Sequence, residues 1–268
     1  MISNNLAVQL FISLALIFSY SVAQASHGPG HTNSQGIIVD AAKALKIANE
    51  RILYAIESQA HNLDLSGLVG LSHLPANIKS LHHLKEINLV NTSITEISLL
   101  AHLTQLKLID ISLSAIIDIS VVSSLSKLET LFLSNSKVRD LAPIAKLENL
   151  KSLYLVNLKI SDFSPLNNLL NIETLDLRYT DFQDVNSIKK LQKLRRINLS
   201  HTPINSLVEL SGFPQLEELE LGHTAVKDFS YLNNFSNLKT LIVAYSKVLP
   251  INASITKDLK HKLRLIFY

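Results

Sequence analysis

A period of 22 residues runs through most of this chain and restricts what it can fold into. Counting from Leu84, an aliphatic residue returns at every twenty-second position as far as Leu238. Two further aliphatic columns follow it, three and five residues later in each of the eight copies. The spacing of two between those later columns is the period of a β-strand, so each copy is expected to contribute one short strand.

After each predicted strand, the apolar positions change to a spacing of three. The first copy shows this change at Ile94, Ile97, Leu100 and Leu103. A step of three fits a 3₁₀-like segment better than an α-helix, whose apolar stripe drifts from three to four. No copy can bury its apolar face alone, whereas stacked copies can. The sequence therefore predicts a solenoid with a parallel sheet along one side.

A hydroxyl-bearing residue stands just past most of the predicted strands. A small hydrogen-bonding side chain there is expected to satisfy backbone groups that the turn removes from the sheet. Leu158 is the exception, and we expect looser backbone hydrogen bonding and faster amide exchange in its copy. The column consists of Thr92, Ser114, Ser136, Leu158, Thr180, Thr202, Thr224 and Ser246.

These repeats resemble leucine-rich repeats. Their core pattern, L-x-x-L-x-L-x-x-N-x-L, is matched by segments such as 194–204, with Thr202 in place of the Asn. The full unit is similar to the 22-residue subclass of bacterial internalins and of a phosphatase-regulating subunit of eukaryotes. The acidic position of that subclass is matched by Glu96, Asp118, Asp140, Asp162, Asp184 and Asp228.

The resemblance implies a fold and a kind of function. The fold is an α/β solenoid, a right-handed horseshoe with a parallel concave sheet, 3₁₀-like convex segments and an N-terminal capping helix. The implied function is binding of a protein or peptide, with host interaction as in internalins, although such repeats bind many unrelated partners. The chain has no cysteine-rich caps of the animal and plant type, which favours a bacterial origin.

The chain divides into five predicted segments. Residues 1–25 carry no charged side chain, and their apolar run ends at Ala23-Gln24-Ala25, which is typical of a secretory signal peptide. A flexible linker (26–37), a helical cap (38–61), the repeats (62–251, one irregular plus eight of 22 residues) and a C-terminal cap (252–268) follow. Cleavage before Ser26 would make the protein secreted or periplasmic; a retained membrane anchor is the alternative.

Both ends of the repeat array are predicted to be capped. Residues 39–60 suit an amphipathic helix with Asp40 as its N-cap. Its expected apolar stripe is Val39, Ala42, Leu45, Ile52, Ala55 and Ile56. Residues 252–268 are expected to form a helical segment and a closing strand, RLIFY, because an open sheet edge invites association.

Composition excludes several functional classes. The 25 basic residues are interleaved with 22 acidic ones, so there is no basic stripe for nucleic acid. The chain has no cysteine, which removes disulfides, thiolate metal sites and cysteine nucleophiles. No phosphate loop, HExxH, calcium loop or nucleophile elbow occurs. We predict a non-enzyme without cofactor or metal, which after signal cleavage contacts no membrane and is a monomer.

The candidate binding surface is the sheet face that points away from the core. Strands about 4.8 Å apart would bring Tyr179, His201, His223 and Tyr245 into one row. Aromatic and Arg residues dominate binding energies at protein interfaces. The predicted partner-binding residues are Phe132, Tyr154, Asp176, Arg178, Tyr179, Arg196, His201, Glu218, Glu220, His223 and Tyr245.

Alternatives remain open for both the surface and the function. Aromatic and charged side chains also occur on strand surfaces simply for cross-strand packing. His201 and His223 could hold a metal, but two ligands make a poor site, and a pH-sensitive contact is favoured. The alternative function is an intracellular regulatory subunit resembling the phosphatase regulator, which requires residues 1–25 to remain uncut. Self-association through the end caps is a further possibility.

Overall fold

The computed structural model describes residues 40–244, 251 and 256–267. The predicted signal segment and linker lie outside these residues, as do Val39, Tyr245 and Ser246.

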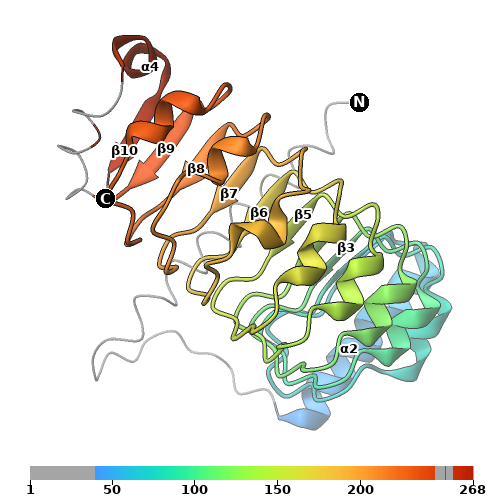
Figure 1. The fold of residues 1–268 in the computed structure, drawn as a ribbon. Coiled ribbons are helices and arrows are strands. Elements are labelled where there is room, and N and C mark those ends of the chain that lie inside the picture. The colour runs from blue at the N-terminus through green and yellow to red at the C-terminus, as the bar shows by residue number, and fades with distance from the viewer. Residues whose placement is uncertain (1–39, 245–250, 252–255, 268) are drawn as a thin grey trace, which may run out of the picture. The chain divides into compact units, whose positions relative to one another are not determined.

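Ten short parallel strands form one open sheet in chain order (Figure 1). Each repeat places its strand one repeat length after the previous one, so that Ile87 pairs with Ile109 and Ile109 with Leu131. The predicted strand in every copy is thereby confirmed. The strands are β1 Asn62–Asp64, β2 Glu86–Asn88, β3 Leu108–Asp110, β4 Thr130–Phe132, β5 Ser152–Tyr154, β6 Thr174–Asp176, β7 Arg196–Asn198, β8 Glu218–Glu220, β9 Thr240–Val243 and β10 Arg264–Phe267.

A short 3₁₀ helix follows each of the strands β1 to β8, as the spacing of three predicted (Figure 1). The acidic column fixes where these helices begin, since the backbone N–H of Ser120 donates to Asp118 Oδ1 at 2.7 Å. Ser206 replaces the acid in one repeat and accepts from Val208 N–H in the same way, at 3.1 Å. The helices are η1 Ala76–Ser80, η2 Ser98–His102, η3 Ser120–Ser124, η4 Ala142–Lys146, η5 Ser164–Asn168, η6 Val185–Ile188, η7 Leu210–Gly212 and η8 Ser230–Asn234.

The aliphatic columns form one continuous core between the sheet and the 3₁₀ helices. The hydroxyl column borders this core and bonds to backbone groups, as predicted. Thr92 Oγ1 donates to Leu89 O at 2.8 Å, and Thr224 Oγ1 donates to Leu221 O at 2.9 Å. Leu158 is buried in the core instead. The faster amide exchange expected in its repeat stays a prediction.

An α-helix, α2 (Ala41–Glu57), packs against β1 and η1. Asp40 is its N-cap, as predicted, and accepts from Lys43 N–H at 2.7 Å. The predicted apolar stripe is partly wrong, because Ala42 is exposed and Leu45 is only half-buried. The buried face consists of Ala44, Ala48, Ile52 and Ala55. These residues follow the helical spacing of four, four and three, and small alanines let the helix approach the first repeat closely.

The other end of the array carries the predicted helix and closing strand. α4 (Lys257–Lys262) begins after Thr256, whose hydroxyl accepts from Leu259 N–H. β10 then extends the sheet by pairing with β9, with Leu265 opposite Leu241. The last repeat is thus followed by one more strand.

Candidate partner-binding surface

Three residues beyond the end of each of the strands β2 to β8, the backbone is left-handed, and we call the residues at these positions the turn column. Its members are Asn91, Leu113, Asn135, Asn157, Tyr179, His201 and His223, with φ angles from 54° to 58°. The left-handed conformation costs an ordinary residue about 1–2 kcal/mol, but asparagine tolerates it. The three asparagines therefore suit the turn, whereas a large side chain such as Tyr179 does not.

The large rings of the turn column form a row that we call the exposed stack, which is Tyr179, His201 and His223. Ring centroids are 4.1 Å apart between Tyr179 and His201 and 4.3 Å apart between His201 and His223. Tyr179 is 41% exposed, and His223 is also exposed. The predicted row therefore exists for these three side chains, and Tyr245 lies outside the described residues.

Electrostatics disfavour a positive charge in the middle of the exposed stack. Partial burial lowers the pKa of His201, and the proximity of His223 and Arg178 lowers it further. His201 is therefore neutral at neutral pH. It gains a proton only under more acidic conditions than an isolated imidazole would.

An ion pair lies beside the exposed stack, at the end of β6. The Arg178 guanidinium donates through Nη2 to Asp176 Oδ2 at 2.7 Å and through Nε to both carboxylate oxygens at 3.1 Å. Asp176 is only 4% exposed, which corrects the expectation that it projects toward a partner. Its carboxylate instead holds the Arg178 head in place.

Glu220, at the end of β8, is a half-buried carboxyl in the same region. Asn198 Nδ2 donates to Glu220 Oε2 at 2.8 Å. Burial raises the pKa of Glu220 to about 7, and repulsion from Asp176 and Glu218 acts in the same direction. Glu218 is partly exposed and Arg196 is exposed, as the sequence predicted.

Two further predicted binding residues, Phe132 and Tyr154, are buried, and we call them the buried pair. Phe132 is 3% exposed and Tyr154 is 8% exposed, which corrects the expectation that their rings face solvent. The rings stack face to face at 4.3 Å. Asp110 and Asp176 occupy the flanking strands at the same register, so side chains stand on both sides of the pair. Burial raises the pKa of Tyr154 to about 12.

Metal binding and membrane spanning find no support in residues 40–244, 251 and 256–267. Within these ranges, no group of three or more His, Asp or Glu side chains is placed to hold a metal ion. The rings of His201 and His223 stack nearly parallel, 22° apart, so their nitrogens do not converge on a common ion. In the same part of the chain, no helix has the length and apolar character needed to cross a membrane.

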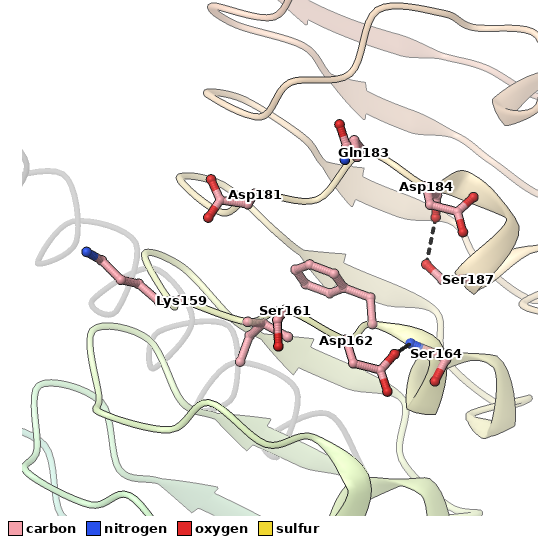
Figure 2. Close-up of a pocket in the computed structure, with 10 residues that line it drawn as sticks. Lys159, Ser161, Asp162, Ser164, Asp181, Gln183, Asp184 and Ser187 are labelled. Atoms are coloured by element: carbon pink, nitrogen blue, oxygen red, sulfur yellow. Dashed lines mark hydrogen bonds between the residues drawn. The ribbon is translucent and has the colours of Figure 1, made fainter.

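A depression of about 510 Å³ lies between the repeats of β5 and β6 (Figure 2), and none of the predicted binding residues lines it. Its acidic side chains serve the backbone, since Asp162 Oδ1 accepts from Ser164 N–H at 2.8 Å. Asp184 Oδ1 likewise accepts from Asn186 N–H at 3.0 Å, and Ser187 Oγ donates to the backbone carbonyl oxygen of Asp184 at 2.6 Å. The N–H of Ser164 lowers the pKa of Asp162. Two of its acids, Asp162 and Asp184, belong to a column that most repeats share, so the sequence pattern does not mark this depression as special.

Comparison with known proteins agrees with the architecture. A family model described as leucine-rich repeats (2 copies) matches residues 126–168. The chain has the fold of a leucine-rich repeat solenoid. Its resemblance to internalins extends to the solved structures below, and no curated protein matches its sequence significantly.

The similar solved structures include two internalins of Listeria monocytogenes. Internalin C2 is 23% identical with a TM-score of 0.66, and the match covers 81% of this chain and all of that one. Internalin F is 21% identical with a TM-score of 0.53, covering 83% and 89% of the two chains. A leucine-rich repeat protein of Leptospira interrogans is 19% identical with a TM-score of 0.55, covering 75% and 61%. At these identities the similarity concerns the fold.

Proposed function

We propose that this leucine-rich repeat protein is an exported, non-enzymatic binding module that holds a protein or peptide on the sheet face around the exposed stack. The partner would contact Tyr179, His201 and His223, together with Arg196 and Glu218. On the resemblance to internalins alone, we extend the proposal to a host protein as the partner.

The observation that carries this proposal is the backbone conformation of the exposed stack. Asn91, Asn135 and Asn157 show that the fold accepts asparagine at this turn without difficulty. Histidine is also enriched in this conformation, but the bulky ring of Tyr179 is unfavourable there, and residues held in sparsely populated conformations cluster at functional sites. Stacking offsets part of that cost, at about 0.5–1.5 kcal/mol per ring pair. A binding role gives the chain a reason to keep exposed rings there.

The experiment replaces the exposed stack by the residue that the turn prefers. Peptides are first selected from a random phage-displayed library against the purified protein, and the best one is titrated. The variant Tyr179→Asn/His201→Asn/His223→Asn should lose at least about tenfold in affinity, as for truncation of a hot spot. Its stability to urea should stay within about 1 kcal/mol, because relief of the left-handed conformation balances the lost stacking.

Leu113→Asn is the matched control. It makes the same kind of change in the same column but outside the exposed stack. It should leave the affinity unchanged. Full binding by the triple variant would refute the proposal that this face holds the partner.

Export rests on residues 1–25 and needs its own test. N-terminal sequencing of the protein from its native cell should find a start at Ser26. An uncut N-terminus would favour the intracellular regulatory alternative.

A further inference from the structure

We propose that the partner presents a lysine or arginine side chain to Glu220 and Glu218, with its aliphatic stem lying along the exposed stack. This inference rests on the proposed function and specifies the chemistry of the partner.

Two other glutamates, Glu129 and Glu217, show how this chain normally pairs a carboxylate of its repeats. Glu129 is held by Lys107 at 2.7 Å and by Lys151 at 2.8 Å. Glu217 is held by Arg195 at 2.8 Å and by Lys239 at 3.2 Å. The chain therefore supplies two cations to each of these half-buried carboxylates.

The glutamates of the sheet face lack such cations. In the described part of the chain, neither Glu220 nor Glu218 has a Lys or Arg nitrogen within 4.0 Å. The neutral amide of Asn198 donates to Glu220 instead. The nearby Arg178 is bound to Asp176 through three hydrogen bonds. Arg178 attracts Glu220 only from beyond contact distance. A half-buried carboxylate without a cation in direct contact is unfavourable for the free protein, and an incoming ammonium or guanidinium group would supply that contact.

The exposed stack provides the rest of the complementarity. Two residues separate the end of β7 from His201, and two separate the end of β8 from His223. Leu199 and Leu221 are buried in the core, and Ser200 and Gly222 are small, so no long side chain intervenes. Lysine and arginine pack their aliphatic stems against apolar surfaces while the charged head reaches a polar partner. An aromatic ring beside the cation adds a cation–π attraction. Tyr179 and neutral His201 fit that environment.

The proposal has a defined pH dependence. Glu220 becomes protonated as the pH falls through about 7, which removes its attraction for a cation. Protonation of His201 at lower pH adds repulsion in the same direction. The other charged groups around Glu220 are Asp176 at the end of β6, Arg178 just after it, Arg196 of β7 and Glu218 of β8. Affinity for a basic peptide should thus be weaker at acidic than at alkaline pH.

The test is a selection of random phage-displayed peptides at pH 8 against the purified protein and, in parallel, against Glu220→Gln. Glutamine keeps the shape and the acceptor for Asn198 but has no charge. Peptides enriched on the wild type should carry a basic residue that is absent from the second selection. Replacing that residue by glutamine in the best peptide should weaken binding at least about tenfold. Binding should weaken by about the same factor from pH 8 to pH 6, where Glu220 is mostly protonated.

Glu217→Gln is the control. Glu217 lies next to Glu218 in the sequence, but Arg195 and Lys239 of the chain already pair with it. This substitution should leave affinity within about twofold, the effect of an exposed charge. Enriched peptides without a basic residue, no enrichment over Glu220→Gln, or equal affinity at both pH values would overturn the inference. If such peptides still required the exposed stack, the proposed function would stand while the basic partner would not. Retained binding by the triple asparagine variant would reject both.

Discussion

The sheet face carries two groups of stacked aromatic rings with almost the same geometry and opposite access to solvent. Phe132 and Tyr154 stack at 4.3 Å with their planes 10° apart, and Tyr179 and His201 stack at 4.1 Å with 12° between planes. The first two are nearly inaccessible, whereas Tyr179 is 41% exposed. Stacking between neighbouring repeats is therefore no sign of a binding site by itself.

The backbone distinguishes the two groups. Phe132 and Tyr154 lie at strand ends, where large flat side chains are ordinary. The exposed stack lies in the turn column, where the left-handed backbone accepts histidine but disfavours a bulky side chain such as that of Tyr179. The buried pair thus contributes to the stability of the sheet. The exposed stack leaves its rings accessible, and the left-handed backbone at Tyr179 has a cost in conformational free energy. Different measurements should respond to the two groups.

The largest effect is expected from truncating the buried pair. Phe132→Ala should lower the free energy of unfolding by about 3–5 kcal/mol, because a buried ring is lost and a cavity remains. Tyr179→Ala should cost less than about 1 kcal/mol, because its ring is already exposed and the turn gains little or nothing from it. Urea unfolding followed by circular dichroism measures both. Equal losses would mean that the two groups do not differ in their role.

A second prediction concerns the carboxyl beside the buried pair. Burial raises the pKa of Asp110 from 3.8 to about 6. A raised folded-state pKa of an acid means that the folded chain loses stability as the pH rises between those two values. Asp110→Asn should remove this loss and stabilise the protein by roughly 2–3 kcal/mol at pH 8, since one pKa unit is worth about 1.4 kcal/mol.

The repeat array supplies the control for this change. Asn88 and Asn198 occupy the same position in other repeats and accept from the N–H two residues on, at 3.0 Å and 2.9 Å. Asp110 does so at 2.9 Å, so asparagine should fit without rearrangement. The stability difference between variant and wild type should shrink when urea unfolding is repeated near pH 4. A difference independent of pH would show that burial of the charge is not its cause.

The architecture could be predicted well from the sequence, because every repeat has the same spacing of apolar residues. Strands, 3₁₀ segments, the Asp40 cap and the closing strand all follow from spacing or local chemistry. Exposure on the sheet face could not be predicted this way, since burial of Phe132 and Tyr154 depends on side chains from neighbouring repeats. A signal for the turn column was available in Asn91, Asn135 and Asn157, because repeated asparagine at one position suggests a left-handed backbone. The absence of a Lys or Arg in contact with Glu220 could not be predicted either, because it depends on where the neighbouring side chains lie in three dimensions.

The smallest predicted effect tests the boundary between the asparagines and the exposed stack. Asn157→Tyr would extend the stack by one ring toward the buried pair, beside Tyr179. It would also remove the hydrogen bond from Asn157 Nδ2 to Asn135 Oδ1, which is 2.9 Å long. We expect a loss of about 1 kcal/mol in unfolding free energy, because the left-handed cost exceeds the gain from one more stacked ring. The reciprocal change, Tyr179→Asn, should leave stability unchanged or slightly higher while weakening peptide binding. If Asn157→Tyr instead stabilised the protein, stacking alone would explain the rings of the turn column, and their backbone conformation would no longer argue for a binding role.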